Sequence, residues 1–170
     1  MTIVLPHGVL FRGGEEGEIR KNLIENNHID TIIGLPANIF FGTGIPTIIV
    51  VLKQHRENTD VLIIDASKGF VKEGKNNKLR ASDIKRISDT VIRRKSVEKY
   101  AKVVDREEIR ANEYNLNIPR YVDSSESAES WDVYASMFGG IPASEIETLQ
   151  EYWDAFPDLK HELFQNSESP

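Results

Sequence analysis

The chain has 170 residues, 39% of them hydrophobic and 28% charged, which allows one domain with a real core and excludes a disordered or collagen-like polymer. The absence of cysteine excludes disulfides, thiolate zinc sites and cysteine nucleophiles, and the four histidines lie too far apart for a local metal motif, so we expect no metal site. The net charge of −6 argues against simple coating of nucleic acid, and the lack of a long apolar run predicts a cytoplasmic protein with no membrane partner.

The first third of the chain alternates apolar runs with one amphipathic segment. The spacing of Ile19, Leu23 and Ile24 predicts a helix over 15–27, with acidic residues placed well for its N-terminus. Apolar and β-branched runs predict strands on both sides of this helix. Such an alternation indicates an α/β layer with at least one parallel strand pair. The expected strands lie at 3–5, 29–34, 47–52 and 61–65.

Phe40-Phe41-Gly42-Thr43-Gly44 spells an aromatic-x-Gly-x-Gly pattern, which can mark a cofactor-binding turn. Such a turn needs a helix directly after the glycines, so that backbone N–H groups face the ligand. Here a strand is expected from Thr47, so the cofactor interpretation fails. The loop is predicted to join two neighbouring antiparallel strands, and its two aromatic residues either fill the edge of the core or project from the loop.

Residues 68–102 form a basic segment, with 12 basic and 4 acidic side chains. Within it, the polar stretch 69–78 predicts an exposed loop, and Ser82 is expected to cap an amphipathic helix. Such a helix can face DNA phosphates, or it can simply be solvated, which is the commoner case for a run of charges. The candidate DNA-binding residues are Lys85, Arg86, Arg93 and Arg94.

The end of the chain is acidic, with 4 basic and 15 acidic side chains in residues 103–170. Residues 123–130 have the composition of a linker, because serine and acidic residues replace apolar ones. This composition predicts one domain over 1–122 and the start of a helical tail over 131–170.

The predicted helical tail carries a narrow apolar stripe. Ser144 and Glu147 have the spacing of a capping box at its start, and Pro157 is expected to stop or restart the helix. The stripe either folds back on its own domain or packs on another subunit. The candidate partner-binding residues are Leu149, Trp153, Phe156 and Leu163.

Several stretches together resemble one family, the modification subunit of type I restriction-modification systems, which is an N6-adenine DNA methyltransferase. The aromatic loop and the Asn-Leu-Asn-Ile-Pro-Arg-Tyr stretch 115–121 are fairly specific in combination. The resemblance implies an α/β fold: the C-terminal part of a Rossmann-like, S-adenosylmethionine-dependent methyltransferase sheet, with an antiparallel last strand, followed by helices. The matching stretches lie at 4–11, 33–36, 40–47, 64–67, 114–122, 152–153, 156–157 and 163–164.

The family's catalytic Asn/Asp-Pro-Pro-Tyr/Phe motif is missing, since the sequence contains no Pro-Pro dipeptide. The resemblance therefore implies a C-terminal fragment, inactive alone and without catalytic residues, of a protein that transfers a methyl group from S-adenosylmethionine to N6 of adenine in DNA. We expect the cofactor in the full-length protein and none in this fragment. The implied partners are DNA and the specificity and restriction subunits of the type I complex. The alternative is a non-catalytic assembly module whose acidic tail docks a specificity or partner subunit.

The resemblance also gives the aromatic loop a role. Enzymes that modify a base inside duplex DNA must extrude it and hold its ring between apolar faces. In similar adenine methyltransferases the loop before the last strand lines the target-base pocket, which implies that Phe40 or Phe41 does so here. Because neighbouring residues on an extended backbone point to opposite sides, we expect one of them in the core and the other in the pocket.

Overall fold

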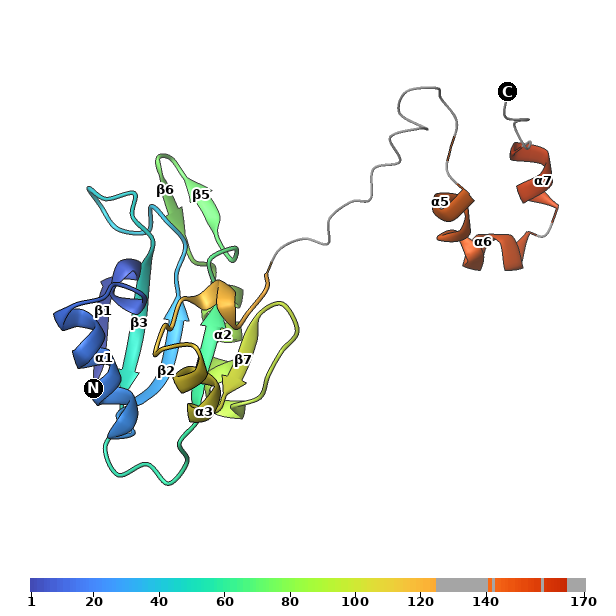
Figure 1. The fold of residues 1–170 in the computed structure, drawn as a ribbon. Helices are drawn as coiled ribbons and strands as arrows, with labels where there is room; N and C mark the ends of the chain where they lie inside the picture. The colour runs from blue at the N-terminus through green and yellow to red at the C-terminus, as the bar shows by residue number, and fades with distance from the viewer. Residues whose placement is uncertain (125–140, 142, 157, 165–170) are drawn as a thin grey trace. The chain divides into compact units, whose positions relative to one another are not determined.

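The computed structural model describes residues 1–124, 141, 143–156 and 158–164, which fall into two compact units, Met1–Ser125 and Glu126–Pro170 (Figure 1). The expected linker at 123–130 lies mostly outside the described residues. In the described part of the chain, no helix combines the length and the apolar character that a membrane crossing requires.

The first unit is built on a sheet of five strands in the order β1-β3-β2-β4-β7. As expected, β3 is antiparallel to both of its neighbours, and β2 pairs in parallel with β4. The edge strand β7 was not expected, because its short Ala-Lys-Val-Val run carries a weak strand signal. The strands span Thr2–Pro6 (β1), Ile29–Gly34 (β2), Thr47–Leu52 (β3), Val61–Asp65 (β4) and Ala101–Val104 (β7).

Helices cover both faces of this sheet (Figure 1), so the predicted α/β fold class is confirmed. Along β4, Val61 and Ile63 face one cluster and Leu62 and Ile64 face the other, because side chains alternate along a strand. The first face carries the α-helices α1 (Glu15–Glu25) and α3 (Arg106–Ala111) and the 3-10 helices η1 (His7–Leu10) and η2 (Ile118–Arg120). The second face carries α2 (Ala81–Arg93).

Arg20 of α1 clamps distant segments of the first face together. Its side chain is 8% exposed, and its Nε donates to the carbonyl of Tyr114 at 2.6 Å. Its Nη1 donates to the carbonyls of Val9 at 2.8 Å and Arg12 at 3.0 Å. A buried guanidinium thus satisfies three backbone acceptors that no helix or strand would pair.

Two expectations for the basic segment are corrected. The stretch 69–78 is exposed, but it holds a two-stranded hairpin, β5 (Val71–Glu73) with β6 (Asn76–Lys78), in place of a plain loop. Helix α2 begins at Ala81, so Ser82 lies inside the helix and is not its cap. The Asp83 carboxylate instead accepts a hydrogen bond from the backbone N–H of Arg80 at 2.9 Å. It thus pairs a backbone donor at the start of the helix that has no partner within the helix.

The described part of the second unit is a set of three short helices, α5 (Ala143–Glu147), α6 (Gln150–Ala155) and α7 (Leu159–Leu163). Ser144 lies inside α5, so the expected cap at this residue is wrong. The break between α6 and α7 falls where Pro157 predicted it.

Candidate nucleic-acid interface

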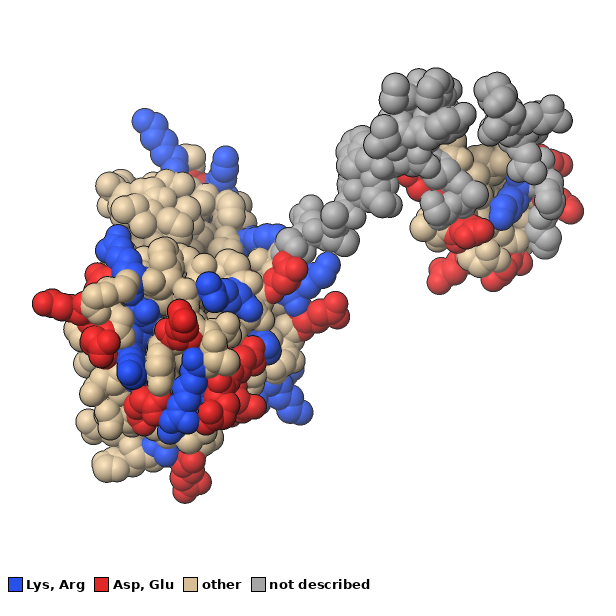
Figure 2. All heavy atoms as spheres, in the orientation of Figure 1, with Lys and Arg blue, Asp and Glu red and all other residues tan. Residues whose placement is uncertain are grey.

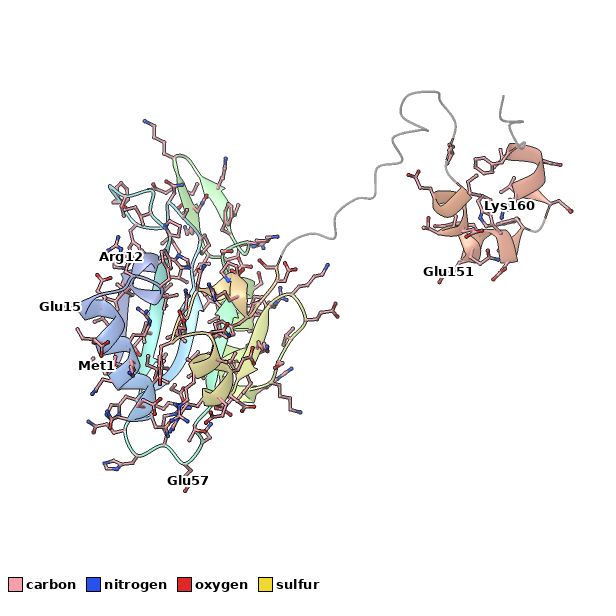
Figure 3. The ribbon with its side chains drawn as sticks, viewed as in Figure 1. Met1, Arg12, Glu15, Glu57, Glu151 and Lys160 are labelled. Carbon is pink, nitrogen blue, oxygen red and sulfur yellow. The ribbon has the colours of Figure 1, made fainter. Side chains whose placement is uncertain are left out.

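The ends of three co-directional strands meet at one edge of the sheet. Since β3 is antiparallel to β1 and β2, and β2 is parallel to β4, the strands β1, β2 and β4 all run the same way. Their C-terminal ends at Pro6, Gly34 and Asp65 define what we call the carboxyl edge. Ligands of open α/β sheets bind at such edges. Figure 3 labels Glu57 on the connection between β3 and β4, which lies at the opposite edge.

The aromatic loop, residues 35–46, leaves the carboxyl edge between β2 and β3. Its base is closed by the Leu35 N–H, which donates to the carbonyl of Thr47 at 2.9 Å. The N–H of His7 donates to the carbonyl of Pro46 at 3.1 Å and ties the loop to the end of β1. Gly42 has φ +80°, a left-handed conformation that glycine adopts without strain. The loop therefore has a fixed base and a turn at its tip.

Both aromatic residues of this loop are exposed. Phe41 has 94% and Phe40 has 43% of its surface exposed. The expectation that one of them fills the core is therefore wrong, because the loop leaves the sheet before Phe40 and buries Leu35 and Pro36 in its place. Ile45 of the same loop is also exposed, and exposed apolar side chains that gather on one segment can mark an interaction site.

Polar groups at the end of β4 serve the structure of this edge. Asp65 accepts hydrogen bonds from the Ser67 N–H at 3.0 Å and from the Ser124 hydroxyl at 2.6 Å. Lys68 donates to the Ser124 carbonyl. These bonds hold the segment that follows η2 against the carboxyl edge.

His7 lies at the same edge. Partial burial lowers the pKa of His7 below its ordinary value, and the charge of Asp65 offsets this only in part. Burial thus favours the neutral form of the ring. His7 and Asp65 were not among the candidate site residues, and the signal that could have found them is that each follows an apolar strand run directly.

The four candidate DNA-binding residues of α2 have different surroundings. Lys85 is exposed and pairs with Asp89 one turn along the helix, at 3.0 Å. Arg86 is exposed and stacks over the Tyr100 ring, with its guanidinium carbon 3.7 Å from the ring centre. Arg93 is exposed at the end of the helix. All three side chains are accessible to a phosphate, but Arg93 adjoins Arg94 and could meet one only at the C-terminal end of the helix.

Arg94 differs, because the fold already uses its guanidinium. Its Nη1 lies 3.2 Å from a carboxylate oxygen of Asp30, and its Nε donates to Asp60 at 3.1 Å. Both acids lie at the beginnings of their strands, so Arg94 is at the edge opposite the aromatic loop. A DNA phosphate would therefore have to compete with Asp30 and Asp60 for the Arg94 guanidinium.

The candidate partner-binding residues also separate into two groups. Trp153 is 8% exposed, donates through its indole N–H to the carbonyl of Ile146 at 2.6 Å and contacts Phe164 edge-on. It therefore belongs to the interior of its own unit. The others are exposed to solvent by 42% to 61%: Leu149, Phe156 and Leu163.

S-adenosylmethionine, which the sequence resemblance implies for the full-length protein, does not fit the described residues. The glycines of the aromatic loop lead into β3 and not into a helix. Gly14 does lead into α1, but the first turn of that helix carries Glu15, Glu16 and Glu18, which would repel the carboxylate of a methionine group. Among the described residues there is also no cluster of three or more potential metal ligands.

Known proteins share this sequence and fold. Residues 1–130 match the family model of the N-6 DNA methylases. The type I restriction enzyme MpnII methylase subunit of Mycoplasma pneumoniae is 41% identical over 133 residues, which cover 78% of this chain and 24% of that protein. The crystal structure of a type I restriction-modification methyltransferase subunit from Streptococcus thermophilus is 54% identical, with a TM-score of 0.72, and the match covers 74% of this chain and 26% of that one.

A further structure shows the fold alone. The EcoKI M protein is 19% identical, with a TM-score of 0.58 over 99% of this chain and 41% of its own. The likeness to these structures confirms the predicted methyltransferase-type sheet. The chain spans about a quarter of the length of the Mycoplasma relative. The match over residues 1–130 confirms the family predicted from the sequence, and this chain belongs to the N-6 DNA methylases.

Proposed function

We propose that this chain is the C-terminal part of a type I modification subunit, whose complete form transfers a methyl group from S-adenosylmethionine to N6 of adenine in DNA. The observation that carries the proposal is the aromatic loop, which places the exposed Phe41 ring at the carboxyl edge of a methyltransferase-type sheet. The chain by itself has no Asn-Pro-Pro motif, so it is inactive alone.

In this proposal, Phe41 holds the target base outside the duplex. Extruding a base costs a few kcal/mol of stacking and pairing energy. Stacking of a base on an aromatic side chain returns about 1–3 kcal/mol. Phe41 is favoured over Phe40 for this role because far more of its ring is free. The chain's contribution to the reaction is therefore to bind and orient the base, with no proton or methyl transfer at its own atoms.

The missing chemistry would come from a part of the protein that continues the sheet. Among the described residues, β1 pairs only with β3, so its other edge offers unpaired backbone groups. Its side chains Ile3 and Val4 are 37% and 49% exposed. An apolar, unpaired edge strand is normally covered in a stable protein. We assign this edge to the half of the subunit that holds the cofactor and the Asn-Pro-Pro motif.

The alternative, a non-catalytic assembly module, has support from a different unit. Leu149, Phe156 and Leu163 are exposed apolar side chains on or beside the short acidic helices, and we infer that they form one docking surface. Such a surface suits docking to a specificity or restriction subunit. The two functions are compatible in one protein, because the base-holding loop and the apolar helices lie in different units.

The test uses the full-length subunit, assembled with its specificity subunit, and a duplex that carries its target site. We expect Phe41→Ala to lower kcat/KM for adenine methylation by about 10- to 100-fold, the equivalent of the stacking energy. Phe41→Trp should keep most of the activity. The matched control is Ile45→Ala, which removes another exposed apolar side chain of the same loop but no ring.

Two results would contradict the proposal in different ways. Wild-type rates in Phe41→Ala would remove Phe41 from the base pocket and direct the same test to Phe40. An assembled protein that binds its specificity subunit but methylates no adenine would leave the assembly module as the function. The isolated chain should bind S-adenosylmethionine weakly or not at all in calorimetry.

A further inference from the structure

The β5–β6 hairpin stands beside the aromatic loop at the carboxyl edge (Figure 1). The two segments are joined through Asn77 of β6. Its backbone N–H donates to the carbonyl of Asn38 at 2.8 Å, and its side-chain Nδ2 donates to the carbonyl of Ala37 at 2.7 Å. Asn38 has φ +54°, so the aromatic loop bends at the point where the hairpin holds it. The position of one segment therefore constrains the position of the other.

The hairpin contributes almost nothing to the core of its unit. All three residues of β5 are exposed, and β6 is only partly covered. A two-stranded hairpin of this size is at best marginally stable in water. Its order therefore depends on a well-formed turn, where Gly74 has φ +65°, and on the two hydrogen bonds from Asn77. Because the hairpin is not needed for the core, its side chains are available to bind a partner.

The hairpin carries three lysines and one glutamate, so only one of its positive charges is paired within it. Lys78 pairs with Glu73 across the two strands at 2.9 Å. Within the described residues, Lys72 and Lys75 form no ion pair, and both are exposed. Figure 2 shows basic side chains projecting at the end of this unit where Figure 1 places the hairpin. Two ammonium groups without an ion-pair partner among the described residues therefore lie on the hairpin that is hydrogen-bonded to the aromatic loop.

We propose that the hairpin and the aromatic loop act as one DNA-contacting rim, in which Lys72 and Lys75 bind the phosphates that flank the nucleotide held by Phe41. This inference rests on the proposed function and adds a phosphate-binding element to it. A base that leaves the duplex rotates about its own backbone, so the phosphates on either side stay within a short distance of the residue that holds the base. Phosphate contacts of this kind fix register and orientation without reading sequence, and lysine suits them as a mobile point charge.

The first test measures how salt affects DNA binding by the assembled full-length enzyme. Each neutralised phosphate contributes about 0.9 to the slope of log affinity against log salt concentration. We therefore expect Lys72→Gln and Lys75→Gln each to reduce the slope by about 0.9, and the double variant by about 1.8. Lys95→Gln is the matched control, since Lys95 is exposed and adjoins Arg94 at the opposite edge.

The second test separates positioning from charge. Asn77→Ala removes the hydrogen bond to Ala37 and leaves the charge unchanged. We expect it to lower the fluorescence of 2-aminopurine placed at the target base several-fold, while the salt slope changes by much less than the roughly 0.9 of a lysine variant, because both ammonium groups remain. Asn76→Ala, one residue earlier in the same strand, should change neither.

The outcomes distinguish this inference from the proposed function. If methylation proceeds and both lysine variants keep the wild-type slope, as Lys95→Gln does, the hairpin is not a DNA contact. If the lysine variants instead lose the specificity subunit at unchanged slope, the surface binds protein and the inference is overturned. If the wild-type assembly neither extrudes nor methylates adenine, the proposed function itself fails.

Discussion

The backbone of Gly34 lies directly against the side chain of Ile118, so that a Cβ built on Gly34 would stand 2.6 Å from the Ile118 Cδ1 atom. Ile118 is 3% exposed and has little room to move away. The contact fixes the segment that contains η2 to the end of β2, where the aromatic loop begins. A side chain at position 34 would therefore require the buried Ile118 to shift.

Gly34→Ala should therefore destabilise the chain, by about 1–3 kcal/mol, because the added methyl group overpacks a filled site. Ile118→Val removes the Cδ1 atom, so the double variant should be more stable than the sum of the two single changes predicts. Gly13→Ala, where a Cβ would meet no atom within 4 Å, is the control. Urea unfolding measures all four proteins, and equal stability of Gly34→Ala and wild type would contradict the contact.

The parts of the fold that depend on local sequence patterns were predictable, and the parts that depend on contacts between distant residues were not. The strands at 29–34, 47–52 and 61–65 have dense β-branched or apolar runs, and local pattern identifies them. The hairpin was missed because five of its six strand residues are polar, and its order comes from its turn, the Glu73–Lys78 pair and its bonds to the aromatic loop. The close packing of Gly34 on Ile118 joins residues far apart in sequence, which no local pattern encodes.

The sequence predicts which segments belong to the candidate site, but not which of their charged side chains are free to bind. The glycines and aromatic residues of the loop are visible in the sequence, and so is the excess of basic residues after it. Which charges are free depends on tertiary partners. Arg94 is held by two acids that precede it by more than 30 residues, whereas Lys72 and Lys75 have no such partner among the described residues. Sequence alone treats all of these residues alike.

A buried carboxylate supports the opposite edge of the sheet. Asp30 is 3% exposed, and its carboxylate oxygens lie 3.0 Å from Lys53 Nζ, 3.1 Å from Arg56 Nε and 3.2 Å from Arg94 Nη1. We expect Asp30→Asn to cost about 3–5 kcal/mol, since it removes the charge that pairs with the buried Arg56 and the partly buried Arg94. Asp89→Asn, which breaks only the exposed pair with Lys85, should cost less than about 0.5 kcal/mol.

The same residue predicts a dependence of stability on pH. Burial alone would raise the pKa of Asp30, but the hydrogen bonds from Lys53 and Thr31 and the charge of Arg94 lower it below its ordinary value. A carboxylate with a lowered folded-state pKa stabilises the protein fully above its unfolded pKa and loses this contribution as the pH falls through the folded value. Thermal unfolding between pH 6 and pH 2 should therefore show a smaller loss of stability for Asp30→Asn than for wild type, and parallel curves would contradict this role.

Glu25 forms an exposed network with Arg110 and Tyr114. Hydrogen bonds from Arg110 and then from Tyr114 lower the pKa of Glu25 to about 2. Arg110→Gln should raise this pKa toward the ordinary glutamate value, which NMR titration of the side-chain carboxyl would measure. Arg12→Gln, which affects only the exposed pair with Glu16, should leave it unchanged.

The network also has a defined pH range of action. Because the folded-state pKa is depressed, the pairing stabilises the protein above the unfolded pKa of glutamate and is lost as the pH falls through about 2. The difference in melting temperature between wild type and Arg110→Gln should therefore be constant near neutral pH and shrink below pH 4. A difference that grows in acid would contradict this assignment.

The short helices of the second unit allow the interior and the outer surface to be tested separately. Trp153 is buried and bonded to Ile146, whereas Phe156, three residues later, is 61% exposed. Trp153→Ala should cost about 3–5 kcal/mol and abolish the hydrogen-exchange protection of α6, because it empties a filled site. Phe156→Ser should change stability by less than about 0.5 kcal/mol and should weaken binding to the specificity subunit at least tenfold.

Glu151→Ser, at an exposed position labelled in Figure 3, is the control for changes on α6 that touch neither residue. Wild-type affinity in Phe156→Ser would mean that the exposed apolar residues are not a docking surface, and retained protection in Trp153→Ala would mean that the indole does not hold these helices together.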